Sequence, residues 1–80
     1  MESLDRLSVG EHCYIKKLNE KGEMFARFTD IGIVPGTMVE CVGQSPFGDP
    51  KAYLIRGAVI AIRNKDCKDI LIESEEPLWD

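Results

Sequence analysis

Two apolar segments joined by a very short link constrain the fold of this chain most. The stretch AYLIRGAVIAIR shows a strand pattern at residues 52–56, a tight link at Gly57 and a second strand pattern at residues 58–63. Glycine adopts positive φ angles at little cost, so it permits a close reversal between two strands. The segment therefore predicts two successive strands in an antiparallel sheet.

Three further strands are predicted at residues 12–18, 38–45 and 70–73. In the first of them Cys13 and Ile15 alternate onto one face, and Leu18 falls out of that register, which indicates a bulge or the end of the strand. Five short strands with short connections predict a mainly β fold, a small and highly curved antiparallel barrel.

Residues 23–32 change from strand spacing to helical spacing. Met24, Phe28 and Ile31 follow one another at helical intervals, which predicts a short amphipathic helix whose apolar stripe packs on the rest of the protein. Gly32 is typical of the left-handed residue that follows a helix C-terminus.

A single helical turn is predicted at residues 64–69, before the last strand. Asn64 can cap this turn, and Cys67 would point inward. Asp66 and Asp69 lie beside lysines in the turn, which indicates that their side of the turn faces solvent.

With 80 residues the chain is expected to form one domain over residues 1–73, followed by an acidic tail at residues 74–80. A domain of this size hides only roughly 60–65% of its unfolded surface, which leaves little volume for a deep catalytic cleft. Residues 1–72 carry 10 basic and 10 acidic side chains. Because this body is neutral, no basic footprint for nucleic acid is expected.

The sequence predicts neither membrane insertion nor secretion. It contains no apolar run long enough to span a bilayer and no basic and apolar leader at its start. The three cysteines form neither a disulfide framework nor a C-x-x-C motif, which indicates free thiols in a reducing compartment. A cytoplasmic location is expected.

The residues that could support catalysis or metal binding do not form a recognisable site. His12 and Cys13 are adjacent on a strand, so their side chains point to opposite faces and do not converge on one ion. Phosphate-binding glycine motifs and zinc-protease motifs are missing from the sequence. We therefore expect no enzyme, no catalytic residues and no resident metal or cofactor.

The segment SPFGDP, residues 45–50, is predicted to be a rigid hairpin connection. Pro46 and Pro50 stiffen its two stems, and Gly48 permits a positive φ at the tip. Phe47 either folds back to plug the core, which is slightly favoured, or stays exposed as a docking residue. A phosphate cradle is disfavoured, because the prolines lack N–H groups and Asp49 would repel anions.

Three segments taken together resemble one known family. RFTDIGIVPGTMVECV (27–42), SPFGDP (45–50) and GAVIAIRNKDCKDILI (57–72) resemble, in order, three motifs of the ferrous iron transport protein A (FeoA) family. The resemblance covers about residues 4–73. Cys41 and Cys67 stand where that family usually has Val and Ala.

The resemblance implies an SH3-like barrel with one inserted short helix and one helical turn. It also implies a non-catalytic cytoplasmic accessory that binds and modulates FeoB, a membrane transporter of ferrous iron. The alternative is a domain that senses or binds ferrous iron or another transition metal, similar to the C-terminal domain of iron-responsive repressors. The expected partner contacts are Arg27, Pro46, Phe47, Gly48, Asp49 and Pro50.

Overall fold

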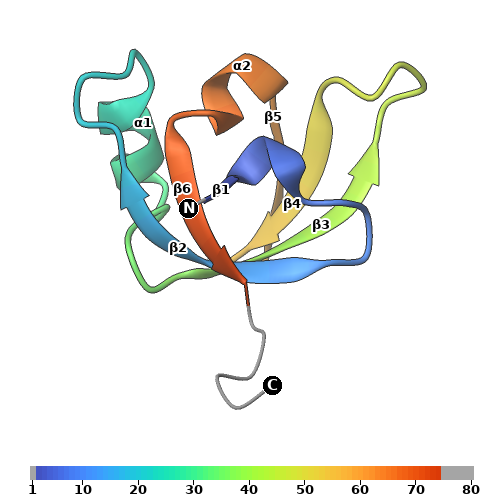
Figure 1. Cartoon of the computed structure of the whole chain (residues 1–80), viewed down its shortest axis with the longest axis horizontal. Coiled ribbons are helices and arrows are strands. Elements are labelled where there is room, and N and C mark those ends of the chain that lie inside the picture. Colours follow the sequence, from blue (N-terminus) through green and yellow to red (C-terminus); the bar gives the residue numbers. More distant parts are fainter. Residues whose placement is uncertain (1, 75–80) are drawn as a thin grey trace.

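The computed structural model describes residues 2–74, in which six antiparallel strands form one curved sheet (Figure 1). The order across the sheet is β1-β6-β2-β3-β4-β5. The strands are β1 (Glu2–Ser3), β2 (His12–Leu18), β3 (Met38–Gln44), β4 (Lys51–Ile55), β5 (Ala58–Ile62) and β6 (Ile70–Ser74). The helical elements are the 3-10 helix η1 (Leu4–Arg6) and the helices α1 (Phe25–Asp30) and α2 (Asn64–Cys67).

The predicted mainly β, barrel-like architecture is confirmed, and each of the five predicted strands is present. The sequence pattern did not indicate β1 and η1, which residues 2–6 form. The predicted acidic tail lies outside the described residues, apart from Ser74, which ends β6.

A bulge in β2 explains the irregular spacing of its apolar residues. The pairing of β2 with β6 shifts register between Ile15 and Lys17. The extra residue returns Leu18 to the inner face, where it is buried. The predicted bulge is therefore confirmed.

The core fills the interior of the curved sheet and is closed at one end by helical elements. Its largest fully buried side chains are Tyr53 and Phe28, from β4 and α1. Leu4 of η1 is also fully buried, and the Tyr53 hydroxyl donates a hydrogen bond to the Leu4 carbonyl at 3.5 Å. The N-terminal segment is thus an integral part of the core.

The predicted role of Gly32 at the C-terminal end of α1 is confirmed. Gly32 has a φ of +94°, and the Ile33 amide donates to the Phe28 carbonyl at 2.8 Å, which completes a Schellman motif. This turn buries Ile33 and leaves Ile31 41% exposed. The prediction that Ile31 packs on the core was therefore wrong.

The turn formed by α2 also differs from its prediction in two respects. The amide of Asn64 donates to a carboxylate oxygen of Asp49 at 2.9 Å, so the helix is capped from a distant loop rather than by Asn64. Asp66 is buried and accepts a hydrogen bond from the Arg63 Nε at 3.1 Å. The prediction of a solvated face is therefore wrong for Asp66.

Candidate functional site

The β3–β4 loop, residues 45–50, forms a tight turn with internal hydrogen bonds. The Gly48 amide donates to the Ser45 carbonyl at 2.8 Å, so Pro46 and Phe47 occupy the two central positions of a β-turn. Gly48 has a φ of +83°, and the Ser45 hydroxyl donates to the Asp49 carbonyl at 2.7 Å. The expected rigid connection with a glycine-dependent reversal is therefore present.

The same loop is fixed to α2. Besides the bond from the Asn64 amide to Asp49, the side-chain amide of Asn64 donates to the Gly48 carbonyl at 3.3 Å. The Asp49 carboxylate accepts the first of these two bonds, which holds the loop onto the helix.

Phe47 lies at the tip of this anchored loop and is 97% exposed. The slightly favoured expectation that it plugs the core was therefore wrong. An exposed aromatic ring on an ordered backbone costs little conformational entropy when it is buried by a partner. Phe47 is therefore the most prominent candidate contact residue of the described chain.

Arg27 is exposed on α1, away from the loop. Figure 1 shows α1 and the β3–β4 loop on opposite sides of the view, with α2 between them. Both elements lie toward the same end of the barrel. The structure therefore places Arg27 and Phe47 on one end of the molecule without bringing them into one compact cluster.

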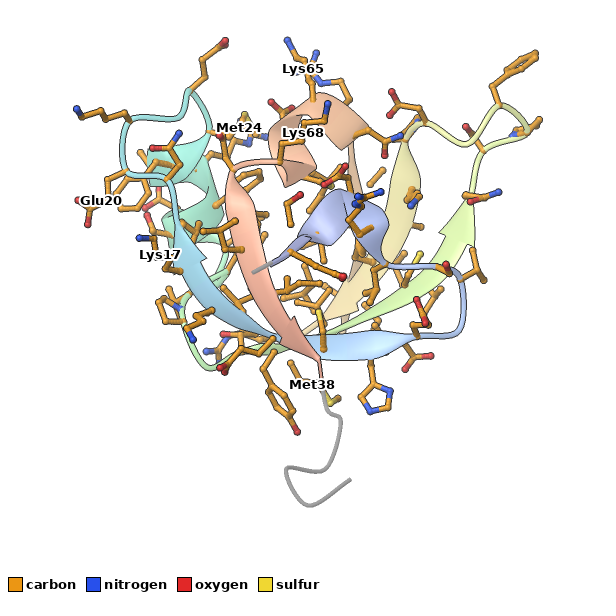
Figure 2. The ribbon with its side chains drawn as sticks, viewed as in Figure 1. Lys17, Glu20, Met24, Met38, Lys65 and Lys68 are labelled. Atoms are coloured by element: carbon orange, nitrogen blue, oxygen red, sulfur yellow. The ribbon has the colours of Figure 1, made fainter. Side chains whose placement is uncertain are left out.

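Helix α2 and the residue that follows it add two positive charges to this end of the barrel. Lys65 of α2 and Lys68, the residue after its last residue Cys67, are both exposed and are labelled in Figure 2. Neither lysine is among the predicted partner contacts, although both lie in the predicted helical turn at residues 64–69. The end of the barrel therefore combines an exposed aromatic ring at one side with basic side chains beside it.

A shallow groove of about 370 Å³ lies on the outer side of β3 and β4. Its lining residues are Gly36, Thr37, Met38, Glu40, Leu54, Arg56 and Gly57. Arg56 is held at one side, where it donates from Nε to the Gly32 carbonyl at 3.0 Å and from a terminal nitrogen to the Thr37 hydroxyl at 3.2 Å. The lining contains no cysteine, histidine or serine that could act as a nucleophile or base.

The cysteine thiols are poorly suited to bind a metal or act as nucleophiles. Cys13, Cys41 and Cys67 are fully buried and free. Burial raises the pKa of Cys13 and of Cys67 to about 11, so both stay protonated at neutral pH. His12 is exposed beside buried Cys13, and residues 2–74 contain no group of three His, Cys, Asp or Glu side chains arranged around one position. The donor set therefore does not fit a transition-metal site.

No helix among the described residues is both long and apolar enough to cross a bilayer.

Comparisons with known proteins agree with this architecture. The iron(II) transport protein A of Clostridium thermocellum is 33% identical, with a TM-score of 0.84 over 91% of this chain. This chain spans only 45% of the length of that protein. No match to a curated protein sequence was found.

Two more distant structures share the fold. FeoA of Stenotrophomonas maltophilia, an SH3 domain protein solved with zinc, is 18% identical with a TM-score of 0.81, and the match covers 91% of each chain. A manganese-dependent transcriptional repressor is 16% identical with a TM-score of 0.80, over 91% of this chain and 41% of the repressor. The model of the FeoA domain matches residues 2–74, and the chain therefore belongs to the FeoA family, with an SH3-like barrel fold.

Proposed function

We propose that this protein is a non-catalytic cytoplasmic accessory of ferrous iron uptake that binds the cytoplasmic part of a FeoB transporter and modulates it. The family supports a role in iron transport. Phe47 is the main support for the proposed contact surface, because its side chain is 97% exposed and lies on a loop that is hydrogen-bonded to Asn64.

The contact forms when the Phe47 ring enters an apolar pocket of the transporter. Aromatic side chains that become fully desolvated in such pockets are frequent hot spots of protein interfaces. Pro46, Gly48, Asp49 and Pro50 act mainly by holding the ring in position. Because Asp49 caps α2, its contribution to binding is indirect.

Arg27, Lys65 and Lys68 form the polar part of the same contact. The side chain of Arg27 has no hydrogen bond or ion pair to another described residue, so its guanidinium is available to a partner carboxylate. Exposed charges at the rim of an interface contribute more to the association rate than to the affinity. We therefore expect Arg27→Ala to weaken binding less than Phe47→Ala.

An NMR titration of the labelled protein with the cytoplasmic part of FeoB tests this proposal. We expect amide shifts at residues 45–50 and in α1, and a loss of affinity of at least about tenfold in Phe47→Ala. Val9→Ala is the matched control, because Val9 is also an exposed apolar residue, 50% exposed, in a different loop. Absence of shifts at both regions at high transporter concentration would contradict the proposal.

A further inference from the structure

Among residues 2–74, strand β5 is one edge of the sheet and pairs only with β4. The opposite edge, β1, is two residues long and carries Glu2, which is a typical protection against unwanted strand pairing. β5 spans five residues, AVIAI, with no charge, proline or bulge. Val59, its second residue, is 65% exposed. β5 therefore lacks the usual features that protect an edge strand.

The hairpin geometry shows which backbone groups of β5 are free. Arg56 and Gly57 connect β4 to β5 and have φ angles of 51° and 83°, as in a type I′ turn. In such a hairpin Ile55 and Ala58 exchange backbone hydrogen bonds, and the bonded pairs alternate along the strands.

It follows that Ala58, Ile60 and Ile62 direct their backbone groups toward β4, whereas Val59 and Ala61 direct theirs away from it. Within the described residues, no backbone hydrogen bond joins Val59 or Ala61 to a loop, a cap or another strand. The free edge therefore offers two N–H and two C=O groups at alternate positions.

This edge is complementary to itself. If two copies of β5 pair antiparallel about a two-fold axis at Ile60, Val59 of one copy lies opposite Ala61 of the other. Both residues are then in hydrogen-bonded positions, and four new backbone hydrogen bonds use all eight free groups. Val59 and Ala61 are apolar and share the outer face, so their side chains also match.

No charge repulsion opposes this register. The two Ile60 side chains face each other at the axis, and the next residue outward, Arg63, lies opposite Gly57 of the second copy. Arg63 already forms an ion pair with Asp66 at 3.1 Å, which neutralises it within its own chain. We propose that the β5 edge is a self-association surface, through which two copies of this chain pair their sheets about Ile60.

The contact is small, so the dimer should be weak and depend on concentration. Pairs that bury little surface fall at the low end of interface sizes, with dissociation constants on the order of micromolar to millimolar. Sedimentation velocity of the full chain from low micromolar to millimolar concentration should show a monomer that converts to a dimer. Amide exchange of Val59 and Ala61 should slow as the dimer forms.

Two variants make the test specific. Ala61→Pro removes a free N–H that does not bond to β4, so the hairpin keeps its ladder while the dimer loses one bond from each copy. Val59→Lys places a charge on the same edge without changing the backbone. Each should raise the dissociation constant at least tenfold. Val42→Lys is the control, because Val42 is an exposed apolar residue on β3, which has a partner on both sides.

A chain that stays monomeric at millimolar concentration overturns the proposal, and so does a dimer that Val59→Lys leaves intact. The proposal is also overturned if dimer formation slows the exchange of other amides and leaves the exchange of the Val59 and Ala61 amides unchanged. Binding to FeoB through the β3–β4 loop does not depend on β5, so the two proposals fail separately.

Discussion

Replacing Gly32 by alanine tests how Arg56 and the end of α1 are fitted together. Gly32 has a φ of +94°, and a Cβ built at this position would lie 2.8 Å from Cδ and 3.0 Å from Nε of Arg56. A left-handed backbone costs a non-glycine residue roughly 1–2 kcal/mol. The arginine must also move, which breaks its hydrogen bonds to the Gly32 carbonyl and the Thr37 hydroxyl.

Those two hydrogen bonds contribute about 1–2 kcal/mol together, because one is exposed and the other is partly buried. Gly32→Ala should therefore lower the free energy of unfolding by roughly 2–4 kcal/mol. In an Arg56→Ala background the crowding is absent, and Gly32→Ala should cost only the backbone share of roughly 1–2 kcal/mol. Alanine at position 56 must adopt the same positive φ as arginine, so the Arg56→Ala background changes the side chain without changing the backbone of the β4–β5 turn.

Urea denaturation of the wild type, the two single variants and the double variant gives the coupling energy. We expect the two substitutions to be non-additive by about 1–2 kcal/mol. Additivity within about 0.5 kcal/mol would refute the reasoning, because it would show that Arg56 does not lie over Gly32 in solution.

Asp49→Ala should lower the free energy of unfolding by about 1 kcal/mol, measured by urea denaturation, because the Asn64 amide loses its cap. Phe28→Ala should lower it by about 3–5 kcal/mol in the same assay, since Phe28 is only 2% exposed and its removal leaves a cavity in the core. Stability should also fall between about pH 9 and pH 11: the thiols of Cys13 and Cys67 ionise near 9 in the unfolded chain and near 11 in the folded one. Between these values the folded state retains protons that the unfolded state loses. Each thiol therefore contributes on the order of 1–3 kcal/mol to the free energy of unfolding below pH 9, and this contribution is lost as the pH rises to 11.

Each of these outcomes has a direct control. Asp30→Ala removes an exposed carboxylate at the end of α1 and should leave stability within about 0.5 kcal/mol of wild type. A Phe28→Ala cost below about 1 kcal/mol would show that this ring is not part of the packed core. A Cys13→Ala variant should lose stability less steeply above pH 9, and an unchanged slope would exclude that thiol as a cause.

The fold could be predicted from local patterns wherever those patterns determine the structure. Alternation in β2 identified Cys13 and Ile15 as buried, and the out-of-register Leu18 correctly indicated a bulge. The glycine between β4 and β5 correctly indicated a close reversal. Helical spacing located α1 and Gly32 correctly indicated its end, but the Schellman turn at Gly32 places Ile33 in the core in place of Ile31.

The candidate site was harder to predict, because its main features depend on contacts distant in sequence. Nothing local to Asp49 indicates that it binds the Asn64 amide, and nothing local to Phe47 indicates whether the core has room for its ring. The sequence around Arg56 does not indicate its unusual backbone conformation. Its φ of 51° places a bulky residue at a turn position where glycine or asparagine is usual. These features require the tertiary arrangement, whereas the resemblance of the loop to a family motif was visible in the sequence.

The position of β6 has a consequence for how the chain is synthesised. The last strand lies between the first two strands, β1 and β2, and pairs with both. Until residue 74 has emerged from the ribosome, β2 exposes the backbone edge that β6 will cover, and η1 has no complete wall to pack against. Synthesis proceeds at about 5–20 residues per second, so this edge is open for seconds in every nascent chain.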